Sequence, residues 1–143
     1  MSEIETIANS IYTDYSCGGR LCGDQYEYIG EGYSRVVYRQ GDFVFKFEFE
    51  DASEDDCNFV EFDSYMALLE RDLPAGYAIP ATDYFILDDG NSCIVMEYIE
   101  GEALPFTTDG GLSEVIFDSY SYNLVQGNDG IVYQIDLGAG LQD

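Results

Sequence analysis

Apolar and aromatic residues occur in short runs in the first third of the chain, and glycines or a compact turn separate one run from the next. The runs at 26–29, 36–39 and 43–49 have the β-branched and aromatic content that is typical of strands. Glycines follow the first run, and a Gln-Gly-Asp turn separates the second run from the third. We therefore predict a meander of three antiparallel strands.

Residues 58–71 have the spacing of an α-helix. Four large apolar side chains recur there three or four positions apart, namely Phe62, Tyr65, Met66 and Leu69. Pro74 and Gly76 end this pattern soon afterwards. A short helix is also expected at 4–11, followed by a glycine-containing loop that extends to residue 25.

Two further pairs of strands are predicted, each around a turn of Asp, Asn and Gly residues. The first pair lies at 82–87 and 93–98, and the second at 123–126 and 131–135. The stretch 101–113 has the composition of a loop. Together these elements predict an α+β domain with an antiparallel five-stranded sheet, one main helix and a short C-terminal β-hairpin.

The composition indicates a folded chain and limits its partners. Of the 143 residues, 46% are hydrophobic and 15% are aromatic, which excludes general disorder and suits a single domain. Asp and Glu number 29 against 5 Lys and Arg, a formal net charge of −24. Direct binding to nucleic acid or to an anionic membrane is not expected, because both need a basic face.

The absence of histidine and the spacing of the cysteines narrow the possible chemistry further. The chain has no histidine, which excludes catalysis by Ser-His or Cys-His pairs and removes the commonest ligand of transition metals. Cys17, Cys22, Cys57 and Cys93 lack the spacing of a zinc site, and we expect them to be reduced thiols. No apolar stretch approaches the length of a membrane span and no leader opens the chain, so a cytoplasmic protein is expected.

Five polar residues follow one another in a distinctive order among the predicted elements: Lys46, Glu61, Asp118, Asn123 and Asp136. Lys46 is the only lysine in the chain and stands among phenylalanines, where a charge needs a partner or a route to solvent. Asp118 and Asn123 have four residues between them, and Asp136 follows 13 residues later, across the second hairpin. This order resembles the protein-kinase-like superfamily, which includes protein kinases and the aminoglycoside and choline phosphotransferases. The resemblance covers about residues 26–140.

The resemblance implies that residues 26–101 correspond to the N-lobe of the family, which binds ATP. Gly30 and Gly32 stand in a glycine-rich strand-turn-strand, where backbone amides approach the nucleotide phosphates, and Val37 would cover the adenine. Lys46 would hold the α- and β-phosphates, and Glu61 would pair with its ammonium.

The remaining site residues implied by the resemblance begin at the end of the strand predicted at 93–98. Glu97 and Tyr98 match the hinge, whose backbone groups hydrogen-bond adenine. Asp118 matches the catalytic aspartate that accepts the hydroxyl proton, so the catalytic set is Asp118, Lys46 and Glu61. Asn123 and Asp136 match the ligands of Mg²⁺, a cation that prefers amide and carboxylate oxygens.

The chain also departs from the family pattern. Arg35 stands where protein kinases have a third glycine, Ile116 replaces the catalytic-loop histidine, and Tyr120 replaces a basic residue. Sixteen residues (102–117) stand where the family places two helices. We therefore expect one kinase-like domain with an N-terminal extension (1–25), an N-lobe (26–101), and a hinge loop with a clipped catalytic hairpin (102–143). The C-lobe would be largely missing.

Two hypotheses of function follow and stay open at this point. The first is an ATP- and Mg²⁺-binding minimal kinase-like phosphotransferase, whose acceptor the sequence does not identify. The second is a catalytically weak or dead kinase-fold interaction protein. It would be an acidic inhibitor of the kind that phages encode, acting in the host cytoplasm. Its carboxylates would imitate nucleic-acid phosphates and block a basic, nucleic-acid-binding protein. Adaptation to high salt is another explanation of the acidity.

The charge imbalance generates a first prediction. Repulsion among 29 acids should destabilise the folded chain at low ionic strength, and salt should relieve it as the screening length shrinks to about 8 Å near 0.15 M. The midpoint of urea unfolding, followed by tyrosine fluorescence, should therefore rise steadily with sodium chloride. A midpoint that does not change with salt would contradict the prediction.

Overall fold

The computed structural model describes residues 3–16, 26–31, 35–49, 57–70, 73, 75–103 and 124–135. The chain forms two compact units, each of which is built from two separate segments. The first unit comprises Met1–Asn58 and Thr82–Tyr98, and the second comprises Phe59–Ala81 and Ile99–Asp143.

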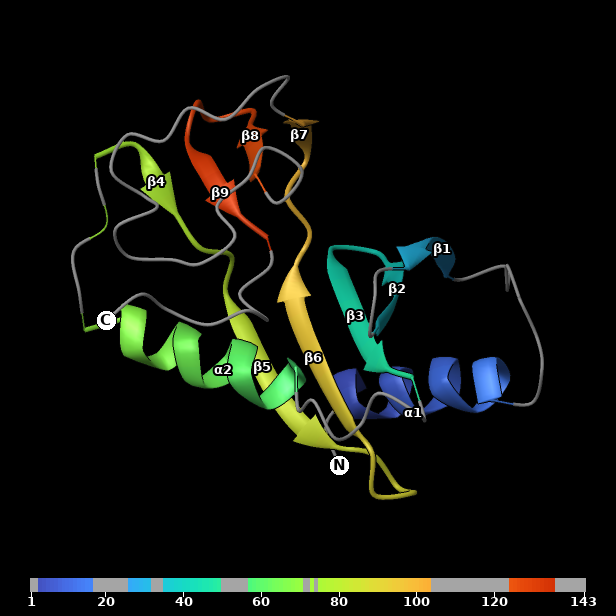
Figure 1. Ribbon diagram of the computed structural model, residues 1–143. Coiled ribbons are helices and arrows are strands. Elements are labelled where there is room, and N and C mark those ends of the chain that lie inside the picture. The colour runs from blue at the N-terminus through green and yellow to red at the C-terminus, as the bar shows by residue number, and fades with distance from the viewer. Residues whose placement is uncertain are drawn as a thin grey trace. The chain divides into compact units, whose positions relative to one another are not determined.

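A five-stranded antiparallel sheet forms the centre of the first unit (Figure 1). Its strands are β1 (Glu27–Glu31), β2 (Arg35–Gln40), β3 (Phe43–Glu48), β5 (Thr82–Ile86) and β6 (Ser92–Glu97). They lie in the order β1-β2-β3-β6-β5, so that β3 is central and the hairpin β5–β6 joins the meander at β3. This arrangement confirms the predicted α+β class and the five-stranded sheet.

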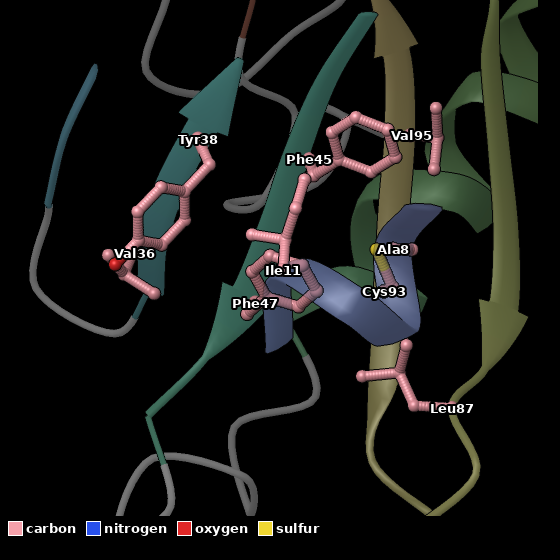
Figure 2. Close-up of a cluster of buried hydrophobic side chains, with 9 residues drawn as sticks. All are labelled: Ala8, Ile11, Val36, Tyr38, Phe45, Phe47, Leu87, Cys93 and Val95. Carbon is pink, nitrogen blue, oxygen red and sulfur yellow. The ribbon is translucent and has the colours of Figure 1, made fainter. Parts of the chain in front are cut away.

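Strict alternation along β3 separates the two faces of this sheet. Phe45 and Phe47 point to one face and are buried, whereas Lys46 between them points to the other. The phenylalanine face packs against α1 (Glu3–Ser16), which contributes Ala8 and Ile11 to the core (Figure 2). The buried cluster on this face comprises Ala8, Ile11, Val36, Tyr38, Phe45, Phe47, Leu87, Cys93 and Val95. The N-terminal extension therefore supplies a longer helix than the sequence predicts, and this helix is part of the core.

Two polar contacts fix α1 against the turn of the β5–β6 hairpin. The Asp88 N–H donates to Asn9 Oδ1 at 2.9 Å, and Asn91 Nδ2 donates to Tyr12 Oη at 2.6 Å. Gly90 closes this turn with a φ of 96°, a value that side-chain-bearing residues rarely adopt. The position of α1 on the sheet is therefore set by the hydrogen bonds of Asn9 and Tyr12 and by the apolar packing of Ala8 and Ile11.

The second unit contains a small four-stranded sheet. Its strands are β4 (Tyr77–Ala78), β7 (Gly101–Ala103), β8 (Leu124–Gly127) and β9 (Val132–Gln134), in the order β4-β9-β8-β7. The predicted C-terminal hairpin is confirmed as β8–β9, and the structure adds a strand at each edge. Gly101 is needed in this sheet because a Cβ at that position would overlap the Gln126 carbonyl of β8. The prediction of a loop from residue 101 onward was wrong for β7.

The Asp129 carboxylate stabilises the β8–β9 turn. It accepts hydrogen bonds from the Ile131 N–H at 3.0 Å and from the Tyr133 hydroxyl at 2.8 Å. These two donors lower the pKa of Asp129 below its ordinary value, because they favour the ionised carboxylate.

Helix α2 (Cys57–Leu68) confirms the predicted helix, but the apolar spacing does not mark its buried side. Met66 and Leu69, at the C-terminal end of the predicted pattern, are exposed. The buried positions recur three or four residues apart along an adjacent side of the helix: Asn58, Glu61, Ser64 and Leu68. Three of these four side chains are polar, so α2 turns a polar stripe inward. Among the described residues, no helix is long and apolar enough to cross a membrane.

The packing of α1 generates a prediction about stability. Replacing Ile11 by alanine should lower the free energy of unfolding by about 3 kcal/mol, because it opens a cavity among well-packed neighbours. Ile86→Ala in β5 is the matched control, since this isoleucine is 57% exposed and its truncation should cost less than about 1 kcal/mol. Urea unfolding of both variants tests the difference. Equal losses would mean that α1 does not contribute to the core.

Candidate functional site

Three residues predicted to bind a nucleotide form one row across the sheet of the first unit. Gly30 of β1 lies opposite Val37 of β2, and Val37 lies opposite Lys46 of β3. The row continues through Ile94 of β6 to Tyr84 of β5. Side chains directly opposite one another in antiparallel strands share a face, so this row lies on the face away from α1.

Lys46 is the charged member of this row and is only 5% exposed. Its strand neighbours across the sheet, Val37 and Ile94, are aliphatic. A buried ammonium is costly unless anionic or hydrogen-bonding groups meet it. The burial of Lys46 therefore requires anionic or hydrogen-bonding groups around its ammonium.

Gly30 lies at an irregularity in the sheet. The β1–β2 register shifts between Tyr28 and Gly30, as at a β-bulge. A Cβ added at Gly30 would meet no atom within 4 Å in the part of the chain that the structure describes, its two chain neighbours apart, so packing of the described residues does not explain the glycine. No described residue covers the backbone on the side where a side chain would project.

Glu97 and Tyr98 lie where β6 ends. Glu97 is opposite Phe43 in the β3–β6 ladder, and the Tyr98 N–H donates to the Asp42 carbonyl at 2.8 Å. The Arg39 guanidinium lies 3.5 Å from the centre of the Tyr98 ring, in a cation–π contact. A ligand that used the Tyr98 N–H as a donor would have to displace Asp42.

Asn58 is a central polar residue that the sequence reasoning missed. It is fully buried at the start of α2, where its backbone N–H donates to Glu48 Oε1 at 2.9 Å. Its side-chain oxygen accepts from Arg35 Nη1 at 3.1 Å. Its side-chain nitrogen lies 3.2 Å from the Lys46 carbonyl oxygen and 3.2 and 3.1 Å from the carbonyl and hydroxyl oxygens of Ser92. Asn58 therefore joins the start of α2 to β2, β3 and β6.

This network bears on the predicted site because it holds the backbone of Lys46. Glu48, two residues along β3, receives a second donor from Ser92 Oγ at 3.4 Å. A carboxylate at a helix N-terminus is also favoured by the helix dipole. Only the position of Asn58, one turn before Glu61 and just after an acidic run, could have pointed to it in the sequence.

The other predicted site residues divide into two groups. Glu61 is described; it lies in α2 within the second unit and is 1% exposed. Gly32, Asp118, Asn123 and Asp136 lie outside the described residues. Within the described ranges, no group of three or more His, Cys, Asp or Glu side chains could hold a metal ion.

Comparison with known proteins finds similarity in solved structures alone. No protein-family model matches the chain. No curated protein sequence matches it either. WbdD bound to the kinase inhibitor LY294002 has a TM-score of 0.48 at 20% identity, with 76% of this chain and 31% of that chain covered. WbdD is a bifunctional kinase-methyltransferase.

Two aminoglycoside phosphotransferases are also similar. ADP-bound APH(2'')-Ib has a TM-score of 0.43 at 23% identity, covering 66% of this chain and 29% of that chain. The GDP complex of aminoglycoside 2'-phosphotransferase-IIIa has a TM-score of 0.43 at 20% identity, covering 77% and 36%. The chain thus spans about a third of the length of these structures.

The Asn58 network generates a prediction. Asn58→Ala should lower the free energy of unfolding by about 2 to 3 kcal/mol, because the Arg35 guanidinium and two carbonyls lose their buried partner. Asn58→Asp should be at least as destabilising at neutral pH, since it places a carboxylate against those carbonyl oxygens. Asn128→Ala, in the exposed β8–β9 turn, is the control and should change stability by less than about 0.5 kcal/mol. Three variants of equal stability would refute the structural role of Asn58.

Proposed function

We propose that the chain binds ATP with Mg²⁺ and acts as a kinase-like phosphotransferase. One observation carries the proposal: the only lysine of the chain is buried on the central strand of the sheet, in a row with Gly30 and Val37. These are three of the residues that the motif resemblance assigns to nucleotide binding. The three residues are adjacent because β1, β2 and β3 pair in this register, and this register is independent of the sequence motifs.

Lys46 is also the position where electrostatic attraction to a phosphate would be strongest. The chain carries 29 acids, so a nucleotide polyanion approaches against an adverse field. A single ammonium in a largely desolvated position interacts with phosphate more strongly than an exposed one, because water screens it less. The position of the only lysine on the central strand β3 is consistent with a local role in binding an anion.

Gly30 supports the same proposal because it leaves space beside the backbone. No described residue occupies the space where its Cβ would lie, and the β1–β2 register is irregular there. A phosphate that approaches backbone amides closely needs such room, which is why glycines line many phosphate-binding loops.

Glu61 and the strand end complete the proposed nucleotide contacts. We assign Glu61 the role of pairing with the Lys46 ammonium, since a buried carboxylate needs a cationic or hydrogen-bonding partner. Backbone groups at Glu97 and Tyr98 would contact the adenine, apart from the Tyr98 N–H, which donates to the Asp42 carbonyl, and Val37 would pack against the adenine ring.

Asn123 and Asp136 are proposed to hold Mg²⁺, which would neutralise charge on the phosphates when bound. Their amide and carboxylate oxygens are ligands that this cation prefers. The chain enters β8 directly after Asn123, and Leu124 pairs with Gln134, two residues before Asp136. In phosphoryl transfer the bond from the γ-phosphorus to the β–γ bridging oxygen breaks, ADP leaves, and an acceptor oxygen bonds the phosphorus. Asp118 would take the proton of that acceptor hydroxyl.

Titration calorimetry with ATP and Mg²⁺ tests the proposal. Wild type should bind, and saturating nucleotide at about 100 times its Kd should add about 2.7 kcal/mol to stability. Lys46→Met keeps the aliphatic stem but loses the charge, and Glu61→Gln removes the proposed partner of that charge. Each should weaken binding at least about tenfold, a loss of about 1.4 kcal/mol.

Two further variants separate binding from folding. Gly30→Ala should leave the melting temperature of the ligand-free protein unchanged, because the added Cβ meets none of the residues that the structure describes, and should still weaken ATP binding. Arg71→Gln removes one positive charge at a position outside the motifs and should leave ATP affinity within about twofold. If titration of wild type with millimolar ATP and Mg²⁺ gives no detectable heat of binding, the proposal is wrong.

A further inference from the structure

The outward side of α2 carries a line of large apolar side chains. Phe59, Phe62, Met66 and Leu69 recur at intervals of three and four residues, which places them along one side of the helix and its last turn. Phe59 is 54% exposed, Met66 48% and Leu69 60%, while Phe62 is half-buried. We call these four residues the outer apolar stripe.

This stripe reverses the usual arrangement of a helix in a globular protein. The buried side of α2 carries Asn58, Glu61, Ser64 and Leu68, and only the last of these is apolar. Single exposed apolar residues are common and need no explanation, but a continuous line of them on one helix is typical of a binding surface. Spacing of three and four residues is also the pattern by which one helix packs on another.

Charge around the stripe restricts what could cover it. Asp63 and Glu70 are both exposed and each follows a stripe residue, Phe59 or Met66, by four positions, so both carboxylates border the stripe. The second unit as a whole contains 12 Asp and Glu and one Arg. A second copy of this chain would bring the same excess of acid to the contact, and an anionic membrane would be repelled. A basic partner would be attracted.

We propose that the outer apolar stripe of α2 is a docking surface for a basic amphipathic helix of a partner protein. Leucine-like side chains of that helix would pack between Phe59, Met66 and Leu69, and its lysines or arginines would lie beside Asp63 and Glu70. The proposal concerns a different surface from the Lys46 row and stands whether or not the chain binds ATP.

Fluorescence anisotropy with a labelled synthetic peptide tests the proposal. The probe is a peptide of about 18 leucines and lysines, ordered so that the leucines form one helical stripe. A peptide of the same composition, with the leucines spread around the helix, measures attraction to acidic charge alone. Wild type should bind the first peptide more tightly than the second.

Paired variants locate the binding. Met66→Gln with Leu69→Gln should weaken the striped peptide about tenfold, since removing apolar anchors has the largest effect at an interface. Asp63→Asn with Glu70→Gln should weaken it about threefold at low salt and less at high salt. Two matched controls lie in the first unit: Ile29→Gln with Ile86→Gln removes exposed apolar residues, and Asp83→Asn with Asp88→Asn removes exposed acids. Both controls should bind like wild type.

Three results would overturn the proposal. Unchanged peptide binding by the Met66→Gln, Leu69→Gln variant would mean that the peptide senses only diffuse charge. A melting temperature lowered by this variant as much as by Leu68→Gln, which alters the buried side, would mean that the chain itself covers the stripe. A concentration-dependent wild-type dimer in sedimentation equilibrium that the variant abolishes would make a second copy the occupant.

Discussion

The alternation of side chains along β3 is the constraint on which the first unit depends. Because successive residues of a strand point to opposite faces, placing Phe45 and Phe47 in the core with α1 obliges Lys46 to face the other way. Antiparallel pairing then aligns Gly30 and Val37 with that lysine. The packing of the core and the geometry of the candidate site are therefore set by the same register, and neither could shift by one residue without the other.

Polar contacts of Asn58 link the strands of the first unit in addition to the apolar packing of its core. The buried Asn58, which belongs to the first unit, hydrogen-bonds partners from β2, β3 and β6. Buried hydrogen bonds are directional, so they fix the position of a helix more narrowly than apolar contact does. Within α2 itself, the buried positions are mostly polar, and the outer apolar stripe is largely exposed.

Much of the described fold could be predicted from the sequence, because strand alternation, helical spacing and turn residues are local signals. The meander, the β5–β6 hairpin and α2 lie within a few residues of the predicted bounds, and the five-stranded sheet is as expected. Strands β4 and β7, of two and three residues, are too short to show a pattern. Asn58 could not be identified, because its partners at Arg35, Lys46 and Ser92 are brought together only by the fold. The inner side of α2 was hidden for the same reason, since polar tertiary contacts overrode the apolar spacing.

The uniqueness of Lys46 has a consequence for the chemistry of the whole chain. Apart from its N-terminus, the chain carries its only primary amine at Lys46, and that side chain is 5% exposed. Acylating reagents, and enzymes that attach acetyl groups or ubiquitin to lysine, therefore find a single, largely buried target in this chain. The folded chain is poorly suited to be marked in this way, whereas an unfolded copy offers its lysine at once.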